Sequence, residues 1–361
     1  MSSSLDRALL FSWLALLALG GVMVTSASVG RLDGIVLRHG VYLMLALILF
    51  VGALLTPLEL WRRNHQWLLL LTFLLCAIVL IPGIGLRANG ARRWIGLGAF
   101  SIQSGEVAKL LLPVYLAGYL ARFHGDQVRA FSVIIRPVVV IALLCGLLIL
   151  QPDFGTLVVL AIVGFALLFL GGMRLGHYLL LVALGVAAVA ALAVFEPYRM
   201  QRLISFTNPW SDAFGNGYQL VQSLIAFGRG EVFGLGLGEG IQKLDYLPEA
   251  HNDFIFAVIA EELGLTGALW VIAVFALLVL RIFRLGRKAL QEGNHFGGYL
   301  AYGVGLALGV QFLVNIGVST GVLPTKGLTL PFVSYGGNSL MVSCAMIGLM
   351  LRLQMERSRY V

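Results

Sequence analysis

Residues 249–264 read Glu249-Ala-His-Asn-Asp253-Phe-Ile-Phe-Ala-Val-Ile-Ala-Glu261-Glu262-Leu-Gly264, which places acidic side chains in a segment otherwise typical of a membrane helix. A charge near the bilayer centre costs about 3 kcal/mol on insertion scales, so such residues usually face the interior of a helix bundle or a wet cavity. Asp253 stands where the helix would begin, and it is either an N-cap or a functional carboxylate. Glu261 and Glu262 lie too far along the helix to cap it, and we expect them to bind neighbouring helices.

The composition is that of a membrane protein. Of the 361 residues, 59% are hydrophobic and only 12% are charged, against about 25% charged residues in soluble domains. The formal net charge of +8 does not indicate nucleic-acid binding, because most Lys and Arg residues lie in short loops between apolar runs, as they do where they set membrane orientation. The three cysteines lie within apolar runs without paired spacing, so the sequence predicts neither a disulfide framework nor a cysteine metal site.

Apolar runs of near-spanning length recur along the whole chain and predict an all-α, polytopic membrane protein with about ten transmembrane helices. We expect a single integral-membrane domain over residues 1–361. The predicted spans are 8–24, 36–56, 66–82, 106–121, 133–150, 155–171, 177–195, 253–283, 297–320 and 338–353.

The distribution of basic residues predicts the orientation in the membrane. An even number of spans places both termini on one side, and Lys and Arg are retained preferentially in cytoplasmic loops. The basic residues on the side of the termini are Arg62, Arg63, Arg122, Arg129, Arg136, Arg174, Arg281, Arg284, Arg287, Lys288, Arg352, Arg357 and Arg359. Both termini are therefore expected to be cytoplasmic.

Two outward connections are too long to be simple turns. The first, about 83–105, carries Arg87, Arg92 and Arg93 against the usual charge bias, and either anchors the chain at the membrane interface with Trp94 or binds an anionic phosphate group. The second, Glu196–Ala250, lies between spans seven and eight, and we expect short amphipathic helices on the outer surface that serve as a lid.

The glycine-rich run at 234–240 within that second connection does not predict a nucleotide site. It lacks the Gly-x-Gly-x-x-Gly spacing and any strand–helix context. We interpret it as tight turns where two backbone segments approach closely.

Charged and polar residues at the outer ends of other spans complete the set of candidates. Glu106 and Lys109 are three apart on one helical face, so they either form a structural ion pair or leave Lys109 free to face a substrate. Asp153 is either a helix cap or a wall of a cavity. The segment 323–339, with two prolines, Lys326 and Ser334, resembles a re-entrant stretch, and such backbone implies a cavity open to the outside.

Taken together, these motifs resemble the SEDS (shape, elongation, division and sporulation) family of peptidoglycan glycosyltransferases from about Val24 to the C-terminus. The resemblance rests on Asn89-Gly-Ala-Arg-Arg-Trp94, Gln103 to Lys109, Gln151-Pro-Asp-Phe-Gly-Thr156, Asn208-Pro-Trp210, Gly217-Tyr-Gln219, Tyr246 to Phe254 and Ser334-Tyr-Gly-Gly337. The stretches 323–331 and 196–199 are similar to the cell-division branch of that family rather than to its elongation branch.

The resemblance implies polymerisation of lipid II at the outer face of the bacterial inner membrane, at the division septum. It implies as partners a class B penicillin-binding protein that acts as transpeptidase, other divisome proteins and membrane lipids. It places the family's essential aspartate on Asp253, as a general base for the attacking sugar hydroxyl. The departing pyrophosphate needs positive charge, from Mg²⁺ or Mn²⁺ or from basic side chains. The residues expected to contribute to substrate binding are Arg92, Arg93, Glu106, Lys109, Asp153, Lys326 and Ser334.

Two other classes of function remain open at this point. A transporter that moves lipid II across the bilayer would suit ten spans, but transporters usually bind near the midplane between internal repeats, whereas these charges gather at the outer edge. A scaffold that only recruits a transpeptidase would not require charged residues around a cavity.

Overall fold

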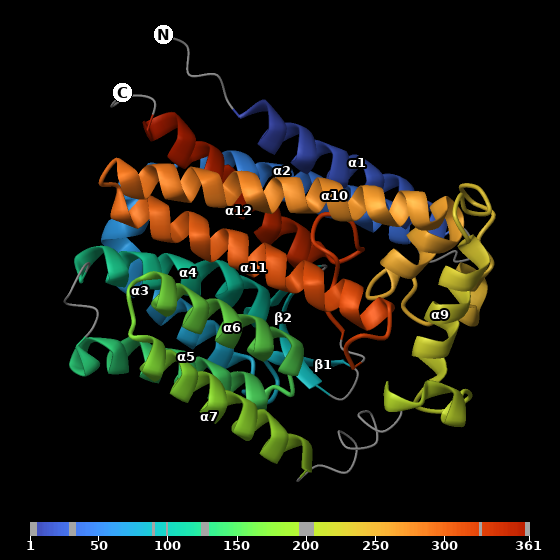
Figure 1. The fold of residues 1–361 in the computed structure, drawn as a ribbon, viewed down its shortest axis with the longest axis horizontal. Helices are drawn as coiled ribbons and strands as arrows, with labels where there is room; N and C mark the ends of the chain where they lie inside the picture. Colours follow the sequence, from blue (N-terminus) through green and yellow to red (C-terminus); the bar gives the residue numbers. More distant parts are fainter. Residues whose placement is uncertain are drawn as a thin grey trace.

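A computed structural model describes residues 6–28, 34–88, 91–98, 100–123, 130–194, 206–324 and 327–357. Ten helices occupy the positions of the ten predicted spans, which confirms the all-α membrane architecture (Figure 1). They are α1 (Arg7–Ala27), α2 (Ile35–Leu55), α3 (Leu58–Ile78), α4 (Ser104–Arg122), α5 (Phe131–Leu150), α6 (Phe154–Leu170), α7 (Leu175–Val194), α10 (Ile255–Gln291), α11 (His295–Ser319) and α12 (Gly337–Arg357).

Six of the described helices, α1, α2, α5, α10, α11 and α12, are long and apolar enough to cross a membrane, while α6 and α7 are shorter apolar helices. The count of ten spans therefore stays a prediction. The largest extensions beyond the predicted spans are those of α3, which begins at Leu58, and of α10, which continues to Gln291. The added turns are rich in Arg and Lys, so a search for apolar runs does not detect them.

Helix α4 lies at the centre of the bundle and packs against α3, α6 and α11. Sixteen of its 19 residues are buried, which is why it shows almost no amphipathic pattern. Helices α10 and α11 run side by side along the molecule, and α12 packs against α2 (Figure 1). The core is a single hydrophobic cluster that includes residues of every one of these helices.

The connection between α3 and α4 contains a small antiparallel sheet that the sequence did not predict. Its strands are β1 (Gly85–Ala88), β2 (Ala91–Leu97) and β3 (Phe100–Gln103), in the order β1-β2-β3. The Asn338 side chain at the start of α12 donates a hydrogen bond to the backbone of Ser101 at 2.9 Å. The sheet is thereby fixed to the end of the bundle where α12 begins.

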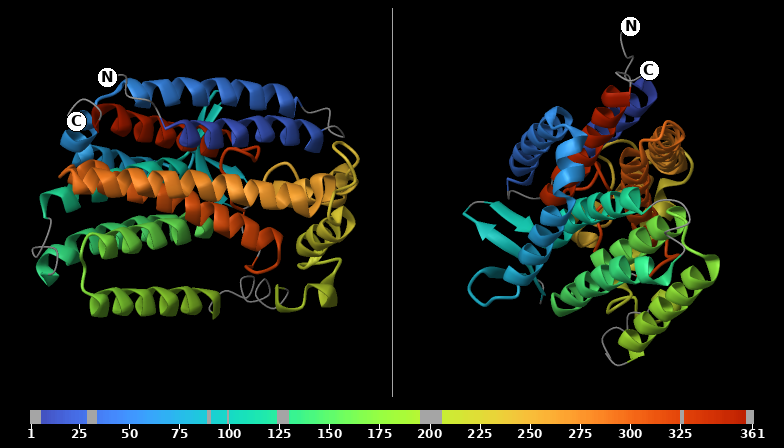
Figure 2. Two further views of the ribbon diagram at one scale, coloured as in Figure 1. Left: turned by 45° about the horizontal axis from the view of Figure 1, so that its top comes forward. Right: turned by 90° about the vertical axis from the view of Figure 1, so that its left-hand side faces the viewer.

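The long connection before α10 folds into short helices, as expected. They are η2 (Pro209–Asp212), α9 (Tyr218–Gly230) and the π-helical turn η3 (Gln242–Tyr246). Helix α9 crosses one end of the bundle, and the start of α1 and the end of α12 lie at the opposite end (Figures 1 and 2). The described part of this connection begins at residue 206.

Helix α10 is interrupted at Gly264, which has φ +68° and ψ −168°. The interruption leaves backbone carbonyl and amide groups of α10 without partners inside the helix, and residues 231–236 form hydrogen bonds with them. The amides of Leu235 and Gly236 donate to the carbonyls of Glu261 and Glu262, both at 3.0 Å. In return, the amides of Leu265 and Thr266 donate to residues 231 and 232 at 2.9 and 3.1 Å. The glycine-rich run thus brings two backbone segments together, as the sequence predicts.

Glu261 and Glu262 hold the same connection in place with their side chains, and both are fully buried. The Glu262 carboxylate pairs with Lys243 at 2.6 Å and accepts from Ser26 of α1 at 2.8 Å. The Glu261 carboxylate lies 3.1 Å from Arg229 of α9 and accepts from backbone amides of η3. The expected binding to neighbouring helices is confirmed, and it extends to the loop that precedes α10.

Candidate functional site

Asp253 lies in the turn immediately before α10, and its side chain does not cap that helix. The N-cap is Phe254, and no side-chain cap hydrogen bond is formed there. The Asp253 carboxylate is half-buried and makes no hydrogen bond or ion pair with any residue that the structure describes. The capping interpretation is therefore wrong, and the carboxylate is available to a ligand.

The surroundings of Asp253 favour its neutral form. The pKa of this carboxyl is raised from 3.8 to about 7: burial is the largest cause, the negative charge of Glu249 adds to it, and the positive charge of Arg93 opposes it. The carboxyl keeps partial contact with solvent, but protein atoms replace most of the water around it. A carboxylate with a pKa near neutrality accepts a proton more readily than an ordinary surface Asp.

Asn315 of α11 fixes the backbone around Asp253. Its side-chain amide nitrogen donates to the backbone carbonyl of Asp253 at 2.8 Å and to that of Leu328 at 2.6 Å. The segment after α11 is thereby held against the turn that carries the carboxylate. At Gly327, a Cβ atom would lie 2.8 Å from Asp253 Oδ2, so a side chain at this position would displace the carboxylate.

Arg93 of β2 is bound to the start of α6. Its Nη2 donates to the Pro152 carbonyl at 2.7 Å, and its Nη1 lies 3.9 Å from Asp153 Oδ1. The buried Arg93 Nε has no hydrogen-bond partner among the described residues. The side chain as a whole is 26% exposed, so its positive charge can act on an anion outside this cluster.

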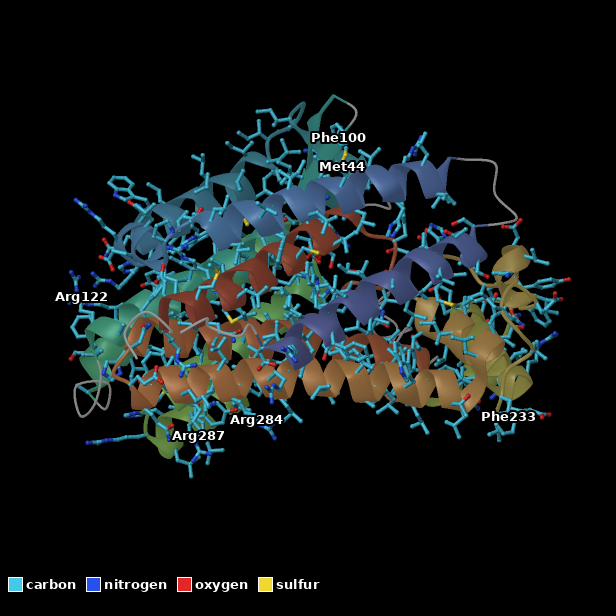
Figure 3. The ribbon with its side chains drawn as sticks, turned by 90° about the horizontal axis from the view of Figure 1, so that it is seen from above. Met44, Phe100, Arg122, Phe233, Arg284 and Arg287 are labelled. Atoms are coloured by element: carbon cyan, nitrogen blue, oxygen red, sulfur yellow. The ribbon has the colours of Figure 1, made fainter. Side chains whose placement is uncertain are left out.

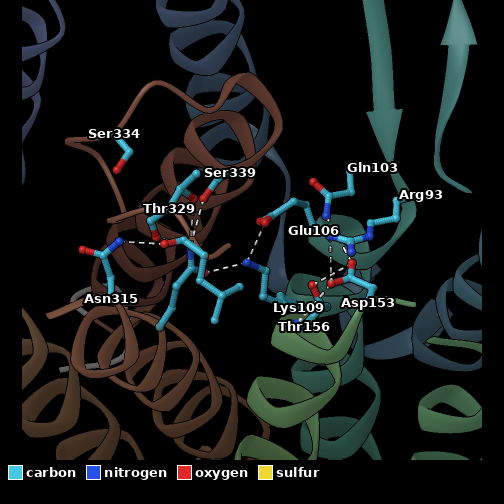
Figure 4. A network of polar contacts seen from close by, with 12 residues as sticks. Arg93, Gln103, Glu106, Lys109, Asp153, Thr156, Asn315, Thr329, Ser334 and Ser339 are labelled. Atoms are coloured by element: carbon cyan, nitrogen blue, oxygen red, sulfur yellow. Dashed lines mark hydrogen bonds and ion pairs between the residues drawn. The ribbon is translucent and has the colours of Figure 1, made fainter. Parts of the chain in front are cut away.

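Asp153 is a helix cap that also takes part in this polar cluster. Its carboxylate accepts from the backbone amide and the hydroxyl of Thr156 and from Gln103 Nε2 at 3.2 Å (Figure 4). The side chain is only 2% exposed. Of the two alternatives for Asp153, the structure therefore shows the helix cap. Its buried carboxylate holds Arg93 and the start of α6 in place and does not face an open cavity.

Arg92 is separated from this cluster. Successive side chains of a strand point to opposite faces, so Arg92 lies on the face of β2 away from Arg93, opposite Arg87 of β1. It makes no hydrogen bond or ion pair within the described ranges. The structure thus places Arg93 close to Asp153, whereas Arg92 lies outside the polar cluster around Asp153.

Glu106 and Lys109 form the predicted ion pair, with Lys109 Nζ donating to Glu106 Oε1 at 2.7 Å. Lys109 is 2% exposed and donates also to Gln311 Oε1 at 2.6 Å. Gln311 in turn donates to Thr329 and to Ser339 (Figure 4). The Lys109 ammonium is therefore directed into a buried network that joins α4, α11 and α12.

The last two candidates belong to the segment after α11. Ser334 is buried, and its hydroxyl accepts from the Leu330 amide at 2.8 Å, which closes the turn before α12. Lys326 lies outside the described residues. Ser334 thus supports the backbone of this segment.

Sequence reasoning missed Gln311 and Asn315, although a signal was present. Both are polar amides in an otherwise apolar run, and they are four residues apart on one face of α11. Polar side chains within a membrane helix usually mark a functional or structural network.

The site offers few metal ligands. Within the described ranges, no three His, Cys, Asp or Glu side chains gather as a metal-binding group. Mg²⁺ is often held by one or two carboxylates and completed by substrate phosphates. The carboxylate of Asp253, which no described residue binds, fits that mode, with Glu249 within electrostatic range.

Helices α4, α6, α10 and α12 are among those that begin at this end of the bundle. Gly105 at the start of α4 touches the start of α6, where an added Cβ would lie 2.9 Å from the Thr156 methyl. Gln311 connects α4 to Ser339 of α12, and Asn315 connects α11 to Asp253. Helix N-termini carry partial positive charge, so their convergence favours an anionic ligand.

Comparison with known proteins gives consistent results. Residues 7–359 match the cell cycle protein family FtsW/RodA/SpoVE. The chain is 48% identical to a probable peptidoglycan glycosyltransferase FtsW of Coxiella burnetii, over 99% of this chain and 98% of the relative. It is 50% identical to the protein of the same name from Nitrosococcus halophilus, over 97% of this chain and 92% of the relative.

Two solved structures are similar over 98% of this chain and 98% of their own. One is from a peptidoglycan synthase complex described as coordinating polymerization and crosslinking, with 30% identity and a TM-score of 0.81. The other is the crystal structure of the rod shape determining protein RodA of Thermus thermophilus, with 29% identity and a TM-score of 0.74.

Proposed function

The chain belongs to the FtsW/RodA/SpoVE family of cell cycle proteins, and we propose that it is a peptidoglycan glycosyltransferase that polymerises lipid II into glycan strands during cell division. The relatives at 48–50% identity carry the name of the division enzyme, which favours septal synthesis over elongation. The observation that carries the mechanism is the Asp253 carboxylate, which has no hydrogen-bond or ion-pair partner among the described residues and lies within electrostatic range of Arg93.

In the proposed reaction the 4-hydroxyl of one disaccharide attacks the anomeric carbon of a second chain. The new glycosidic bond forms as the bond to undecaprenyl pyrophosphate breaks, with inversion in a single displacement. Asp253 takes the hydroxyl proton, which suits a carboxylate whose pKa is about 7. Asn315 holds the turn that carries this carboxylate.

The pyrophosphate leaves with negative charge, and cationic groups stabilise it. Arg93 is partly exposed and carries positive charge, and the N-termini of α4, α6, α10 and α12 point to the same end of the bundle. We include Lys326 of the adjoining segment in this role. Lys109 acts indirectly, since its ammonium is buried against Glu106 and Gln311.

A divalent cation, Mg²⁺ or Mn²⁺, would be held by Asp253 and Glu249 together with substrate phosphates. The ion would supply positive charge to the leaving pyrophosphate.

We place the protein in the inner membrane at the division septum, with the Asp253 end facing outward and both termini in the cytoplasm. The basic residues at the ends of α3, α10 and α12 support that orientation. A class B penicillin-binding protein is the proposed crosslinking partner, and the likeness to a synthase complex supports it. Other divisome proteins complete the proposed assembly.

The test is the Asp253→Asn variant, assayed for glycan strands made from purified lipid II by the protein and its partner. Asn keeps the size of the side chain and cannot take up a proton, so polymerisation should fall by about 10²–10⁴. The thermal midpoint should not fall, because this side chain does not cap α10. A matched control is Glu239→Gln, which removes an exposed carboxylate from the same end of the molecule and should keep full activity.

Metal titration of the residual rate separates the two roles of the carboxylate. A variant that lost only the base should keep its dependence on Mg²⁺ or Mn²⁺, whereas a variant that lost a metal ligand should need far more of the ion. Polymerisation by Asp253→Asn at the wild-type rate would contradict both roles. If the partner alone made glycan strands, the polymerase assignment would be contradicted, and the transporter or scaffold function would be favoured instead.

A further inference from the structure

A second polar site lies at the end of the molecule opposite Asp253. A cavity of about 420 Å³ lies between the last turns of α10, the end of α12 and the residue that precedes α1. Its charged lining consists of Arg281, Arg284, Arg287, Lys288, Arg357 and Asp6. Five cations thus face one carboxylate around a single opening.

Part of this positive charge is neutralised within the protein. Arg281 Nη2 lies 2.7 Å from Asp6 Oδ2, and Arg357 Nε donates to Glu292 at 2.6 Å. Arg284, Arg287 and Lys288 form no ion pair within the described ranges, and all three are exposed. The cavity therefore keeps three cationic side chains in excess.

The contacts at the cavity fix its shape. Asp6 caps α1 by accepting from the amides of Ala8 and Leu9, and its own amide donates to Gln354 of α12 at 3.0 Å. The ion pair with Arg281 then ties α10 to the same point. Three helix ends are held around the opening, which distinguishes it from a mobile basic loop.

An apolar surface continues from the cationic rim toward the middle of the bundle. Leu280 is four residues before Arg284 and so shares its face of α10, and it is 52% exposed. Helix α1 packs along α10, and its Phe11 is 60% exposed. Figure 3 shows Arg284 and Arg287 on the outer edge of α10. The cations at the end of α10 would suit the anionic headgroup of a phospholipid, and the exposed apolar side chains next to them would suit its acyl chains.

We propose that this cavity binds the phosphate headgroup of an anionic phospholipid, whose acyl chains lie along the exposed apolar residues of α1 and α10. In the orientation proposed above, the lipid belongs to the cytoplasmic leaflet. Basic pockets between membrane helices on that side are suited to such headgroups. Membrane orientation needs only basic residues scattered over the cytoplasmic loops. Here the basic residues line one cavity between helix ends that ion pairs hold together, and orientation alone does not require such a cavity.

The test uses the full-length protein in nanodiscs that contain phosphatidylcholine and phosphatidylglycerol, with bound lipid measured by native mass spectrometry. The wild-type protein should retain phosphatidylglycerol preferentially. The triple variant R284Q/R287Q/K288Q should lose that preference by about tenfold or more, because each cation near the membrane surface contributes about 1 kcal/mol.

The matched control is R63Q/R122Q/R174Q, which removes three exposed cations that do not line the cavity. The control should change the preference less than about twofold if the cavity is specific. An equal loss in the control would show that only the overall charge attracts the lipid, and would overturn the proposal. If the triple variant does not fold, the single variants R284Q and K288Q replace it, and each should weaken retention several-fold relative to R122Q.

Competition with inorganic phosphate separates a lipid from a soluble anion. Phosphate should displace phosphatidylglycerol poorly, and Leu280→Asn should weaken lipid retention several-fold while leaving phosphate binding unchanged. Full displacement by phosphate, together with no effect of Leu280→Asn, would overturn the lipid assignment.

Discussion

Two opposite charges act on the carboxyl of Asp253. Burial makes the largest contribution to its raised pKa, Glu249 raises the pKa as well and Arg93 lowers it, and together they place it at about 7. Glu249 belongs to the same turn as Asp253, whereas Arg93 belongs to the sheet before α4, far away in the chain. The proton affinity of the proposed base is therefore set by the fold.

The polymerisation rate should rise with pH through an apparent pKa near 7 and reach a plateau above it, because a general base must be deprotonated to act. The measurement is the initial rate of glycan-strand synthesis from pH 5 to 9. Glu249→Gln should shift the midpoint to lower pH, and Arg93→Gln should shift it to higher pH. Shifts in the reverse directions would contradict this electrostatic assignment.

The same pKa predicts a pH dependence of stability. The folded state raises the Asp253 pKa above its unfolded value of 3.8, so the folded protein binds more protons between that value and about 7. Its contribution to the free energy of unfolding should fall as pH rises through this window and stay constant above it. Asp253→Asn should remove this component from thermal midpoints measured across the window.

The buried pair of Glu106 and Lys109 should be coupled in stability. Removing one partner leaves the other charge buried and unpaired, which typically costs about 3–5 kcal/mol. Lys109→Met should therefore lower the thermal midpoint strongly, and Glu106→Gln with Lys109→Met should recover part of the loss. The measurement is a double-mutant cycle of thermal midpoints in detergent. Additive effects would show that the two side chains do not interact energetically.

At the scale of elements, the interruption of α10 joins the outer connection to the bundle. Gly264 has a positive φ, and a Cβ there would lie 2.3 Å from the amide nitrogen of Gly234. The four backbone hydrogen bonds at this point depend on that close approach. The interruption is thus a joint between α10 and the segment that carries α9 and η3.

Gly264→Ala should destabilise the protein by at least about 1–3 kcal/mol, because the substitution adds backbone strain and a steric clash. The measurement is the thermal midpoint, together with protease sensitivity of the connection before α10. Gly309→Ala is the control, since this glycine lies within α11 and an added Cβ would make ordinary contacts at 3.7 Å. The control should be neutral or more stable, by about 0.5–1 kcal/mol.

At the scale of the whole molecule, the two ends carry different chemistry. Helix α9 and the connection before α10 lie at one end, and the basic ends of α10 and α12 lie at the other (Figures 1 and 2). Lys and Arg are retained on the cytoplasmic side. The end with α9 is therefore expected to face outward.

Labelling of single cysteines in intact cells tests this orientation. Ser211→Cys lies in the exposed turn η2 and should react with a membrane-impermeant reagent, whereas Gln291→Cys at the end of α10 should react only after lysis. The native Cys76 and Cys344 are buried, and the partly buried Cys145 is replaced by Ala in both variants to keep the background low. The opposite pattern would reverse the proposed topology.

The sequence by itself determined the helical membrane fold. The length of an apolar run decides whether a helix can span the bilayer, and the charge of the loops decides its orientation, and both are local properties of the sequence. It also singled out Asp253, Glu106 and Lys109 as candidates, since an ionisable group in an apolar run stands out without any knowledge of its neighbours. Only the tertiary structure decided what these groups touch. It separated Arg93 from Arg92 by the alternation of a strand that no apolar pattern predicts, and it buried Lys109 against Gln311, 202 residues away in the chain. Contacts between residues so far apart depend on how the helices pack, and that packing is not encoded in any single stretch of sequence.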